Sequence, residues 1–457
     1  MTQGKWTPSI PAGGTPKYLA VVAAIERAIE SGELQPNQRL PTNRELRELF
    51  DVTIATVTKA MAVAARKGLI VAQVGSGTFV RDTTASTPKI ESLDLSLNIL
   101  PSGVVDHALQ GLAQAQAGAN LARHMFGYGS YAAAPAHARR AIDWMATFGA
   151  PAEPDNVLLT VGVHQGLMAA FHALLAPGDS AICEELTYTG IKRIASYRNV
   201  SLHGARCDEH GMVPESLEKL LKSGAAKVVI VTSALHNPTT ATLPLERREA
   251  IARLCTKYDA YLVEDGINLP LVGESVPTVS SFAPERSLFL TGFSKCVASG
   301  FRLGYAVTPP SIQGAFYEAL VSTQWIGPSL YADLAETMLG DGLVERCTQS
   351  HRDEARARYT LASQILKGVR PTRTPGYHAW VDAPAGQQSE NFVMQALRQG
   401  VKVSPATHFA VSGGAAISPT SYRISLGACA DRAELERALH ILAGIDTQHQ
   451  STVSTLI

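Results

Sequence analysis

Apolar and polar positions alternate along residues 1–81 with two different periods, first that of helices and then that of strands. In residues 17–31 the apolar side chains recur every three or four positions, which places them on one face of a helix. These apolar side chains are Tyr18, Val22, Ile25 and Ile29. Thr42 and Glu45 form a T-x-x-E capping box, which predicts a second helix that runs to about Phe50.

A third helix is predicted over residues 53–66, after a tight turn, with Thr53 as its N-cap. Its inward face carries Val57, Met61 and Ala64. Two short apolar strands, residues 69–73 and 78–80, follow around a glycine-rich turn that suits a β-hairpin. Three helices and a hairpin in this order predict a winged helix-turn-helix, in which the third helix enters the major groove of DNA.

The exposed face of the third helix offers short polar and cationic groups that can reach base edges and phosphates. These groups are Thr56, Thr58 and Lys59. A plain three-helix packing module would also need capping boxes and apolar faces, so the pattern leaves both interpretations open. Charge adds modest support for DNA. The whole chain has 40 basic and 40 acidic residues, but residues 1–82 carry ten Lys or Arg against seven Asp or Glu.

The cysteines and the apolar runs indicate a protein of the cytoplasm. The six cysteines are scattered, with no CxxC pair and no Cys/His spacing typical of a metal site. Proline and glycine interrupt the N-terminus where a signal peptide needs an unbroken apolar core. No apolar run approaches the roughly 20 residues of a membrane helix. We therefore expect a cytoplasmic protein with no membrane partner and no metal.

Residues 82–92 are polar, contain proline and lack periodicity, so we interpret them as a linker between residues 1–81 and a larger domain, residues 93–450. In this larger domain, short apolar runs rich in branched residues alternate with longer helical runs. The short runs are Val157–Val161, Ser180–Cys183, Val228–Thr232, Tyr261–Glu264 and Ser287–Leu290. Such alternation predicts an α/β domain with a mostly parallel sheet covered by helices.

Glycine, amide and charged residues follow the predicted strands, at the sheet edge where open α/β sheets bind ligands. Gly162 opens a helix after the first strand, and free amides at a helix N-terminus suit a phosphate. The other such residues are Asn237, Asp265, Lys295 and Arg302. Each of them alone is typical of a solvated loop. Together they supply what pyridoxal phosphate needs: an amine, a carboxylate for the ring nitrogen, and cationic or amide groups for the phosphate.

We assign these residues to separate parts of that cofactor. Lys295 supplies the amine for a Schiff base, and it must be partly desolvated to be nucleophilic. Asp265 partners the pyridine nitrogen, and Asn237 donates a hydrogen bond to the 3-oxygen of the ring. The phosphate cup consists of Gly162, Val163, His164 and Arg302.

Several runs between Gly32 and Val80 resemble the GntR-type winged helix: LPTNREL at residues 40–46, VTIATV at 52–57 and GSGTFV at 75–80. In that family the arginine after the LP pair, the start of the recognition helix and the glycine-rich wing contact DNA. The resemblance therefore implies that the DNA-contacting residues include Arg44, Thr53, Thr56 and Gly77.

The larger domain resembles fold-type I aminotransferases. The resemblance rests on the S-K-x-x-x-x-G-x-R-x-G run at residues 294–304 and on its spacing from N-P-T at 237–239 and E-D at 264–265. It implies a large, mostly parallel α/β/α sheet and a smaller C-terminal α/β subdomain at about residues 330–450.

The same resemblance implies three further ligand residues. Tyr188 would stack on the cofactor ring, and Tyr128 would reach the cofactor phosphate, often from the partner subunit. Arg423 lies on a short predicted strand where this family places the arginine that binds a carboxylate, here that of an effector. The alternative for Arg423 is a charge on a surface strand.

The two parts together resemble the MocR subfamily of GntR regulators over nearly the whole length. This resemblance implies a head-to-tail homodimer that binds double-stranded operator DNA and pyridoxal 5'-phosphate and responds to an amino-acid-like effector or to the cofactor itself. Three positions depart from the aminotransferase pattern. Ile267 replaces a tyrosine, Gly292 a phosphate-binding serine, and Thr240 the glycine of P-T-G. Since Ile267 cannot donate a hydrogen bond, we expect a sensor rather than full transamination.

Two other functions stay open at this point. One is a working aminotransferase with an appended DNA-binding domain, which steady amino-group transfer to a keto acid would favour. The other is a repressor whose sensor domain has lost the cofactor and responds through dimerisation alone. The presence of Lys295, Asp265, Asn237 and Arg302 weighs against this last function.

Overall fold

The computed structural model divides the chain into two units, residues 1–91 and 92–457, which we describe separately. The described residues are 6, 16–35, 38–66, 69–73, 77–80, 93–106, 108–110, 127–411 and 420–456. The predicted linker, residues 82–92, lies outside them, as do the hairpin turn residues 74–76. The predicted domain limits therefore stay predictions.

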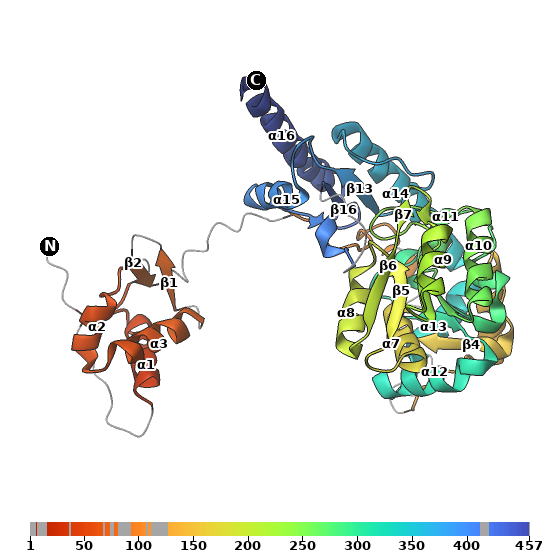
Figure 1. Cartoon of the computed structure of the whole chain (residues 1–457), viewed down its shortest axis with the longest axis horizontal. Coiled ribbons are helices and arrows are strands. Elements are labelled where there is room, and N and C mark those ends of the chain that lie inside the picture. Colours follow the sequence, from red (N-terminus) through yellow and green to blue (C-terminus); the bar gives the residue numbers. More distant parts are fainter. Residues whose placement is uncertain are drawn as a thin grey trace. The chain divides into compact units, whose positions relative to one another are not determined.

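The helices and strands of the N-terminal unit follow the predicted order (Figure 1). They are α1 (Lys17–Glu30), α2 (Asn43–Phe50), α3 (Ile54–Arg66), β1 (Ile70–Gln73) and β2 (Gly77–Val80). The capping box forms, with the Thr42 side chain accepting from the backbone N–H of Glu45. Thr53 caps α3 in the same way, since its Oγ1 accepts from Thr56 N at 3.2 Å. A threonine side chain thus accepts a hydrogen bond from a free backbone amide at the start of α2 and of α3.

The core of this unit forms from the predicted apolar faces. Val22 and Ile25 of α1 pack with Val57 and Ala64 of α3, and all four are buried. β1 and β2 pair antiparallel, with Ile70 opposite Val80. The predicted winged helix-turn-helix is confirmed.

The second unit is built on a central sheet that has seven strands within the described part of the chain (Figure 1). In spatial order they are β4 (Val157–Thr160), β12 (Gly304–Val307), β11 (Ser287–Gly292), β10 (Tyr261–Asp265), β9 (Val228–Val231), β5 (Ser180–Glu184) and β6 (Ser201–Ala205). β12 runs antiparallel to both β11 and β4, and the other described strand pairs of this sheet are parallel, so the predicted mostly parallel sheet is confirmed. Two strands were not predicted from the sequence: β6, an edge strand with half-exposed residues, and β12, which begins at a glycine.

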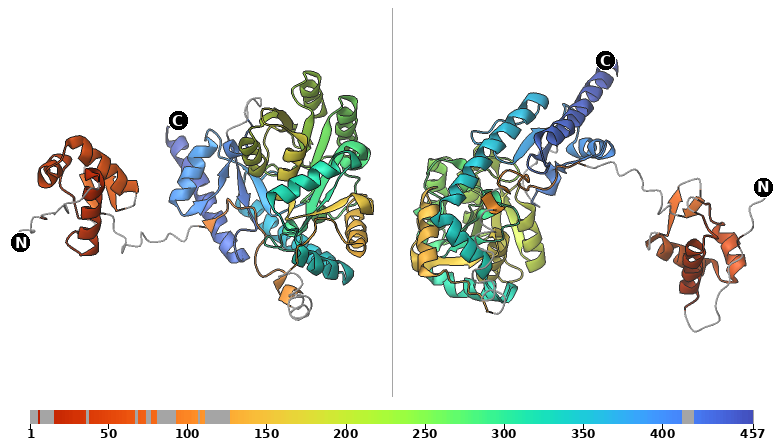
Figure 2. Two further views of the ribbon diagram at one scale, coloured as in Figure 1. Left: turned by 90° about the horizontal axis from the view of Figure 1, so that it is seen from below. Right: turned by 180° about the vertical axis from the view of Figure 1, so that it is seen from behind.

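Helices cover both faces of this sheet, because strand residues alternate between the faces (Figures 1 and 2). Ile230 of β9 packs in a cluster with α7, α8 and α12, whereas Val229 and Val231 pack with α9 and α10 on the other face. The helices of this region are α6 (Pro135–Ala146), α7 (Val163–Leu174), α8 (Thr189–Arg198), α9 (Pro214–Lys222), α10 (Leu245–Lys257), α11 (Leu269–Val272), α12 (Pro310–Thr323) and α13 (Ser329–Gly340). Each fully buried Val or Ile contributes roughly 1.5–3 kcal/mol to folding.

The C-terminal part carries a small antiparallel sheet with its own buried cluster. Its elements are β13 (His378–Asp382), β16 (Ser421–Ser425), β15 (Ser404–Pro405), α14 (Leu343–Ile365), α15 (Ser389–Arg398) and α16 (Arg432–Leu456). A short strand, β3 (Leu93–Asp94), pairs with β14 (Val401–Lys402), so the segment after residue 93 lies beside this C-terminal part. Among the helices that the structure describes, none has the length and apolar character needed to span a membrane.

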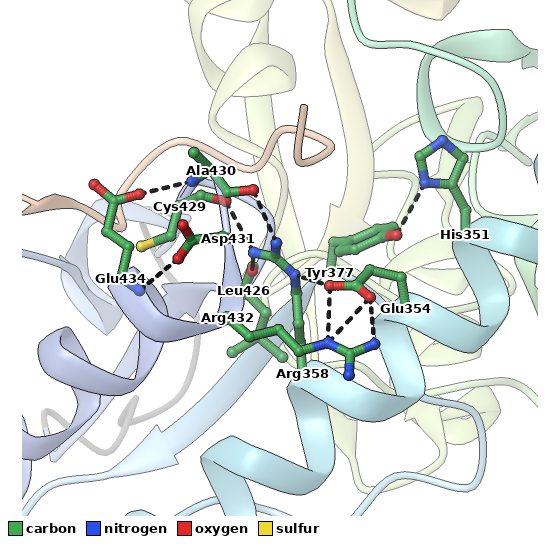
Figure 3. A network of polar contacts seen from close by, with 10 residues as sticks. All are labelled: His351, Glu354, Arg358, Tyr377, Leu426, Cys429, Ala430, Asp431, Arg432 and Glu434. Carbon is green, nitrogen blue, oxygen red and sulfur yellow. Dashed lines mark hydrogen bonds and ion pairs between the residues drawn. The ribbon is translucent and has the colours of Figure 1, made fainter. Parts of the chain in front are cut away.

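A polar network around the buried side chain of Arg358 fixes α14 to the segment that follows β16 (Figure 3). Arg358 donates from Nη1 to the carbonyl oxygens of Leu426 and Cys429 at 2.8 and 2.9 Å. Glu354 accepts from Arg358 Nε and from Arg432 Nη2, both at 2.6 Å. Because β16 ends directly before this network, the network holds in place the strand that carries Arg423.

Candidate functional site

A cavity of about 400 Å3 lies at the carboxyl ends of the parallel strands of the central sheet. Most of the predicted ligand residues line it, namely Val163, His164, Tyr188, Asn237, Asp265, Lys295, Arg302 and Arg423. Gly162 is the N-cap of α7, directly before two of these residues. Tyr128 is not among the lining residues, and its side chain is 82% exposed. The fold thus brings together an amine, a carboxylate and several cationic groups from distant parts of the chain.

Lys295 ends the short 3-10 helix η4 (Phe293–Lys295), which follows β11 directly. Its ammonium donates a hydrogen bond to the carbonyl oxygen of Asn98. Burial, together with the positive charges of Arg423 and Arg302 and against the opposing charge of Asp265, lowers the pKa of Lys295 from 10.5 to about 8. A substantial fraction of this amine is therefore neutral near pH 8, and a neutral amine is the nucleophilic form.

Asp265 is the last residue of β10, and only 6% of it is exposed. Its Oδ1 accepts a hydrogen bond from Ile267 N at 3.1 Å, and it has no ion pair within the described residues. Burial raises the pKa of Asp265 to about 6, although that hydrogen bond and the charge of Lys295 both act to lower it. A buried carboxylate of this kind suits a ligand that brings a positive charge to it.

The N-terminus of α7 and the guanidinium of Arg302 form a cradle for an anion. Gly162 has φ +77°, and a Cβ atom there would lie 2.7 Å from Arg302 Nη2. The guanidinium thus reaches the helix start only because residue 162 lacks a side chain. Arg302 also donates from Nη1 to Ser294 Oγ at 3.2 Å, which places a hydroxyl at the cradle.

The glycine that replaces the expected phosphate-binding serine has a steric reason. A Cβ atom on Gly292 would lie 2.6 Å from the carbonyl oxygen of Leu303, where β11 and β12 approach closely. No side chain fits at this position without a shift of the neighbouring backbone. In this chain Ser294, two residues later, lines the cavity and supplies a hydroxyl beside Arg302.

Arg423 lines the same cavity and is buried, on the central strand of the small sheet. Its Nη1 donates to Asn237 Oδ1 at 2.8 Å, and its Nη2 donates to the carbonyl oxygen of Ser96. The guanidinium carbon also lies 4.9 Å from the centre of the Phe409 ring. Burial lowers the pKa of Arg423 to about 10, so the side chain is charged at neutral pH. The alternative of an exposed charge on a surface strand is therefore wrong.

Two aromatic rings border the cavity near the start of α8. Tyr188, the N-cap of α8, lies 6.2 Å from the ring of His164 in an edge-to-face arrangement. Burial raises the pKa of Tyr188, so its hydroxyl is neutral. Ile267 also lines the cavity and presents an apolar side chain at the position of the expected tyrosine.

Several residues that line the same cavity were not predicted from the sequence. They are Ser96, Leu97, Asn98, Ile99, Thr189, Arg193, Thr232, Asn268, Ser294 and Ser299. The first four reach the site because β3 pairs with β14, and residues 93–94 lie about 300 positions from 401–402 in the sequence. No local pattern signals such a pairing. Arg193 carried a weaker signal, since it lies one helical turn after Thr189 on α8.

In the N-terminal unit, the residues predicted to contact DNA lie on α2, on α3 or directly before it, and on β2. Arg44, Thr53, Thr58 and Lys59 are exposed, and Thr56 is partly exposed. Lys59 Nζ lies 4.2 Å from the centre of the Tyr18 ring. Thr53 and Thr56 share a hydrogen bond of 2.8 Å between their hydroxyl oxygens. These residues are thus available to a partner, and their contact with DNA stays a prediction.

One cation near the wing was missed. The backbone of Arg39 forms a bridge with Phe79 of β2, and a Cβ atom on Gly77 would lie 2.8 Å from Arg39 Nε. The exposed guanidinium therefore lies over the predicted wing glycine. In the sequence, only the position of Arg39, two residues before Pro41, could have indicated this cation.

Comparisons with known proteins match both units. A model of the family "Aminotransferase class I and II" matches residues 90–442, and a model of "Bacterial regulatory proteins, gntR family" matches residues 17–80. The chain is 29% identical to the uncharacterized HTH-type transcriptional regulator YdeF of Bacillus subtilis (strain 168), over 96% of each chain. It is 27% identical to the HTH-type transcriptional regulator TauR of Rhodobacter capsulatus, over 84% of this chain and 88% of TauR.

A solved structure supports the fold of the second unit. LysN, the α-aminoadipate aminotransferase of Thermus thermophilus complexed with N-(5'-phosphopyridoxyl)-L-leucine, matches with a TM-score of 0.70. The match has 21% identity and covers 79% of this chain and 93% of LysN. The predicted fold class, a winged helix-turn-helix joined to an aminotransferase-like α/β domain, is confirmed.

Proposed function

The chain belongs to the family of class I and II aminotransferases and carries an N-terminal domain of the bacterial gntR regulatory family, and from this premise we propose that it is a transcription regulator of the MocR type. Its N-terminal unit binds double-stranded operator DNA. Its second unit binds pyridoxal 5'-phosphate and senses an amino-acid-like effector or the cofactor itself. The relatives YdeF and TauR, both named as HTH-type transcriptional regulators, support this proposal.

The observation that carries the proposal is the meeting of Lys295, Asp265, Arg302 and Arg423 in one cavity. The residues fit pyridoxal phosphate, because Gly162 leaves room for Arg302 at a helix N-terminus and Asp265 is a buried carboxylate without an ion pair in the described chain. When bound, this cofactor supplies an aldehyde that condenses with primary amines. Lys295 would hold it by its amine, Asp265 by the ring nitrogen, and Arg302 with the first amides of α7 by the phosphate.

The remaining residues around the cavity would orient the cofactor and the effector. Asn237 and Tyr188 border the space that the ring would fill, and Arg423 is placed to bind the carboxylate of an amino acid. Arg423 and the segment around Ser96 belong to the C-terminal side of the cavity, whereas Lys295 belongs to the central sheet. An effector that contacts both sides would favour one packing of them over another.

The proposed functional form is a head-to-tail homodimer in the cytoplasm. Tyr128 and Trp325, which are 82% and 73% exposed, lie on neighbouring segments, since Gly327 N donates to Gly129 O at 2.9 Å. Exposed aromatic residues of this kind suit a contact with a second copy. In such a dimer, Tyr128 would reach the cofactor phosphate in the partner's cavity.

A mobility-shift experiment tests the regulator proposal. The probe is the DNA upstream of the gene for this chain, with a scrambled fragment as control, in the presence and absence of pyridoxal phosphate and of L-glutamate, L-glutamine or L-alanine. We expect preferential binding to the upstream DNA and an affinity that changes with the added ligands. Lys295→Ala should bind DNA but lose the response. Equal binding to both fragments, or a response unchanged in Lys295→Ala, would contradict the proposal.

One observation favours a second function, an active aminotransferase. The pKa of Lys295 lies at about 8, which suits an amine that moves protons near neutral pH. Against it, Ile267 lines the cavity where a hydrogen-bond donor is expected. Steady transfer of the amino group of L-glutamate to oxaloacetate, far above the rate with free cofactor, would favour the enzyme.

A further inference from the structure

A second cavity, of about 860 Å3, adjoins the first one on the side of the C-terminal sheet. The two cavities share the lining residues Ser96, Leu97, Thr189, Arg193 and Arg423. A ligand that reaches Lys295 in the first cavity can therefore extend past Arg423 into the second. Arg193 and Arg423 are the two cationic residues, among those described, that line both cavities.

Arg193 differs from the other lysine and arginine residues that line the two cavities. The others each have a hydrogen-bond or ion-pair partner: Lys192 with His408, Lys295 with Asn98, Arg302 with Ser294, Lys402 with Asp94 and Arg423 with Asn237. Arg193 has none within the described residues, although it is close enough to lower the pKa of His164. Within the described part of the chain, its guanidinium is thus free to bind a ligand.

The charges around the two cavities leave Arg193 and Lys192 without an assigned anion, and of the two only Lys192 has a hydrogen-bond partner among the described residues, the carbonyl oxygen of His408. Under the proposed function, Arg302 faces the cofactor phosphate, Asp265 faces the ring nitrogen, and Arg423 faces the carboxylate of the effector. Among the described residues that line the second cavity there is no aspartate or glutamate. Arg193 is exposed and has no anionic partner among the described residues, so its positive charge attracts an anion that enters the cavity.

We propose that Arg193 binds a second anionic group of the effector, so that the effector is an α-amino acid with an acidic side chain. This inference rests on the proposed function of the same cavity. The α-carboxylate lies on Arg423, and the side chain extends into the second cavity, where its terminal anion meets Arg193. Lys192 and Lys402 add positive charge to the same cavity, although their own partners already hold them.

A binding experiment with matched amino acids tests this inference. The full chain is loaded with pyridoxal phosphate, and L-glutamate and L-glutamine are titrated separately, as are L-aspartate and L-asparagine. Each pair has nearly the same shape and differs in one negative charge. The readouts are the change in cofactor absorbance and the shift in the midpoint of thermal unfolding. We expect the acidic member of at least one pair to bind about tenfold more tightly than its amide.

Variants of Arg193 separate a role in specificity from a role in structure. Arg193→Gln should lose the preference for the acidic amino acid while it binds the amide as the wild type does. Arg193→Lys, which keeps the charge, should retain part of the preference. Arg206→Gln removes the same charge from an exposed residue that lines neither cavity, and it should behave as the wild type.

The possible results distinguish this inference from the proposed function. If the wild type takes up pyridoxal phosphate and responds to amino acids but prefers neither member of a pair, the role of Arg193 is wrong and the sensor proposal stands. The same holds if Arg193→Gln keeps the preference. If the wild type takes up no cofactor, both fail.

Discussion

Arg423 and Asn237 are hydrogen-bonded to each other, with 2.8 Å between Arg423 Nη1 and Asn237 Oδ1. Arg423 belongs to the small antiparallel sheet, and Asn237 follows β9 of the central sheet. The bond therefore joins the two sheets across the cavity. A carboxylate that binds Arg423 would share this guanidinium with Asn237, so effector binding would act directly on this joint.

The first prediction concerns Arg423. Arg423→Lys should weaken binding of L-glutamate to the cofactor-loaded chain by about tenfold or more, because an ammonium cannot present two parallel donors to a carboxylate. Uptake of pyridoxal phosphate should change little, since Arg302 and Lys295 hold different parts of the cofactor. Absorbance titrations measure both affinities. Arg370→Lys, an exposed residue paired with Asp382, is the matched control, and an equal loss in both variants would reject the role of Arg423.

The second prediction concerns the anion cradle. Gly162→Ala should weaken uptake of pyridoxal phosphate by about tenfold or more, because the added methyl group displaces Arg302 and cationic contacts to phosphate are strong. Gly224→Ala is the control: Gly224 has φ +72° and nothing lies within 4 Å of its Cβ position. Both variants carry backbone strain of about 1–2 kcal/mol, which urea unfolding measures. Equal cofactor affinity in the two variants would show that the cradle plays no part.

The third prediction concerns pH. Burial holds the pKa of Lys295 at about 8, and only the neutral amine attacks an aldehyde. The rate at which the chain captures pyridoxal phosphate should therefore rise about tenfold per pH unit below pH 8 and level off above it. Stopped-flow absorbance between pH 6.5 and 9.5 provides the rate, with Nα-acetyl-lysine as the reference amine. A rate that keeps rising throughout this range, as with the reference, would mean that Lys295 has an ordinary pKa.

The fourth prediction concerns DNA. Arg44 is exposed at the start of α2, where we expect it to contact a DNA phosphate. The Arg44→Ala variant should therefore bind the operator more weakly, with a salt slope lower by about one counterion. Arg47→Ala changes the same helix at a residue that already pairs with Glu48 at 3.2 Å, so its salt slope should stay near that of the wild type. Fluorescence anisotropy at several salt concentrations measures both. An unchanged slope in Arg44→Ala would exclude a phosphate contact.

Much of the fold could be predicted because its signals are local. The capping box at Thr42 and the apolar faces of α1 and α3 depend only on neighbours in the sequence. Buried strands such as β9 are short runs of branched residues, which are easily recognised. The edge strand β6 has half-exposed residues, and β12 begins at a glycine and has only one β-branched residue, so neither shows a clear pattern.

The candidate site could be predicted in part for a related reason. Asp265 and Lys295 follow parallel strands, and the carboxyl ends of such strands meet at one edge of the sheet. Ser96 and Asn98 could not be found in this way, because they reach the cavity through the pairing of β3 with β14. Arg193 depends on which face of α8 is turned to the cavity, which tertiary packing decides.

The most direct test of the central claim is the absorbance of the purified chain after incubation with pyridoxal phosphate and removal of the free cofactor. We expect a band in the near ultraviolet or visible region for the wild type, and loss of this band in Lys295→Ala with the fold retained by circular dichroism. A wild type that shows no such band, or a Lys295→Ala variant that keeps it, would contradict the claim that Lys295 holds this cofactor.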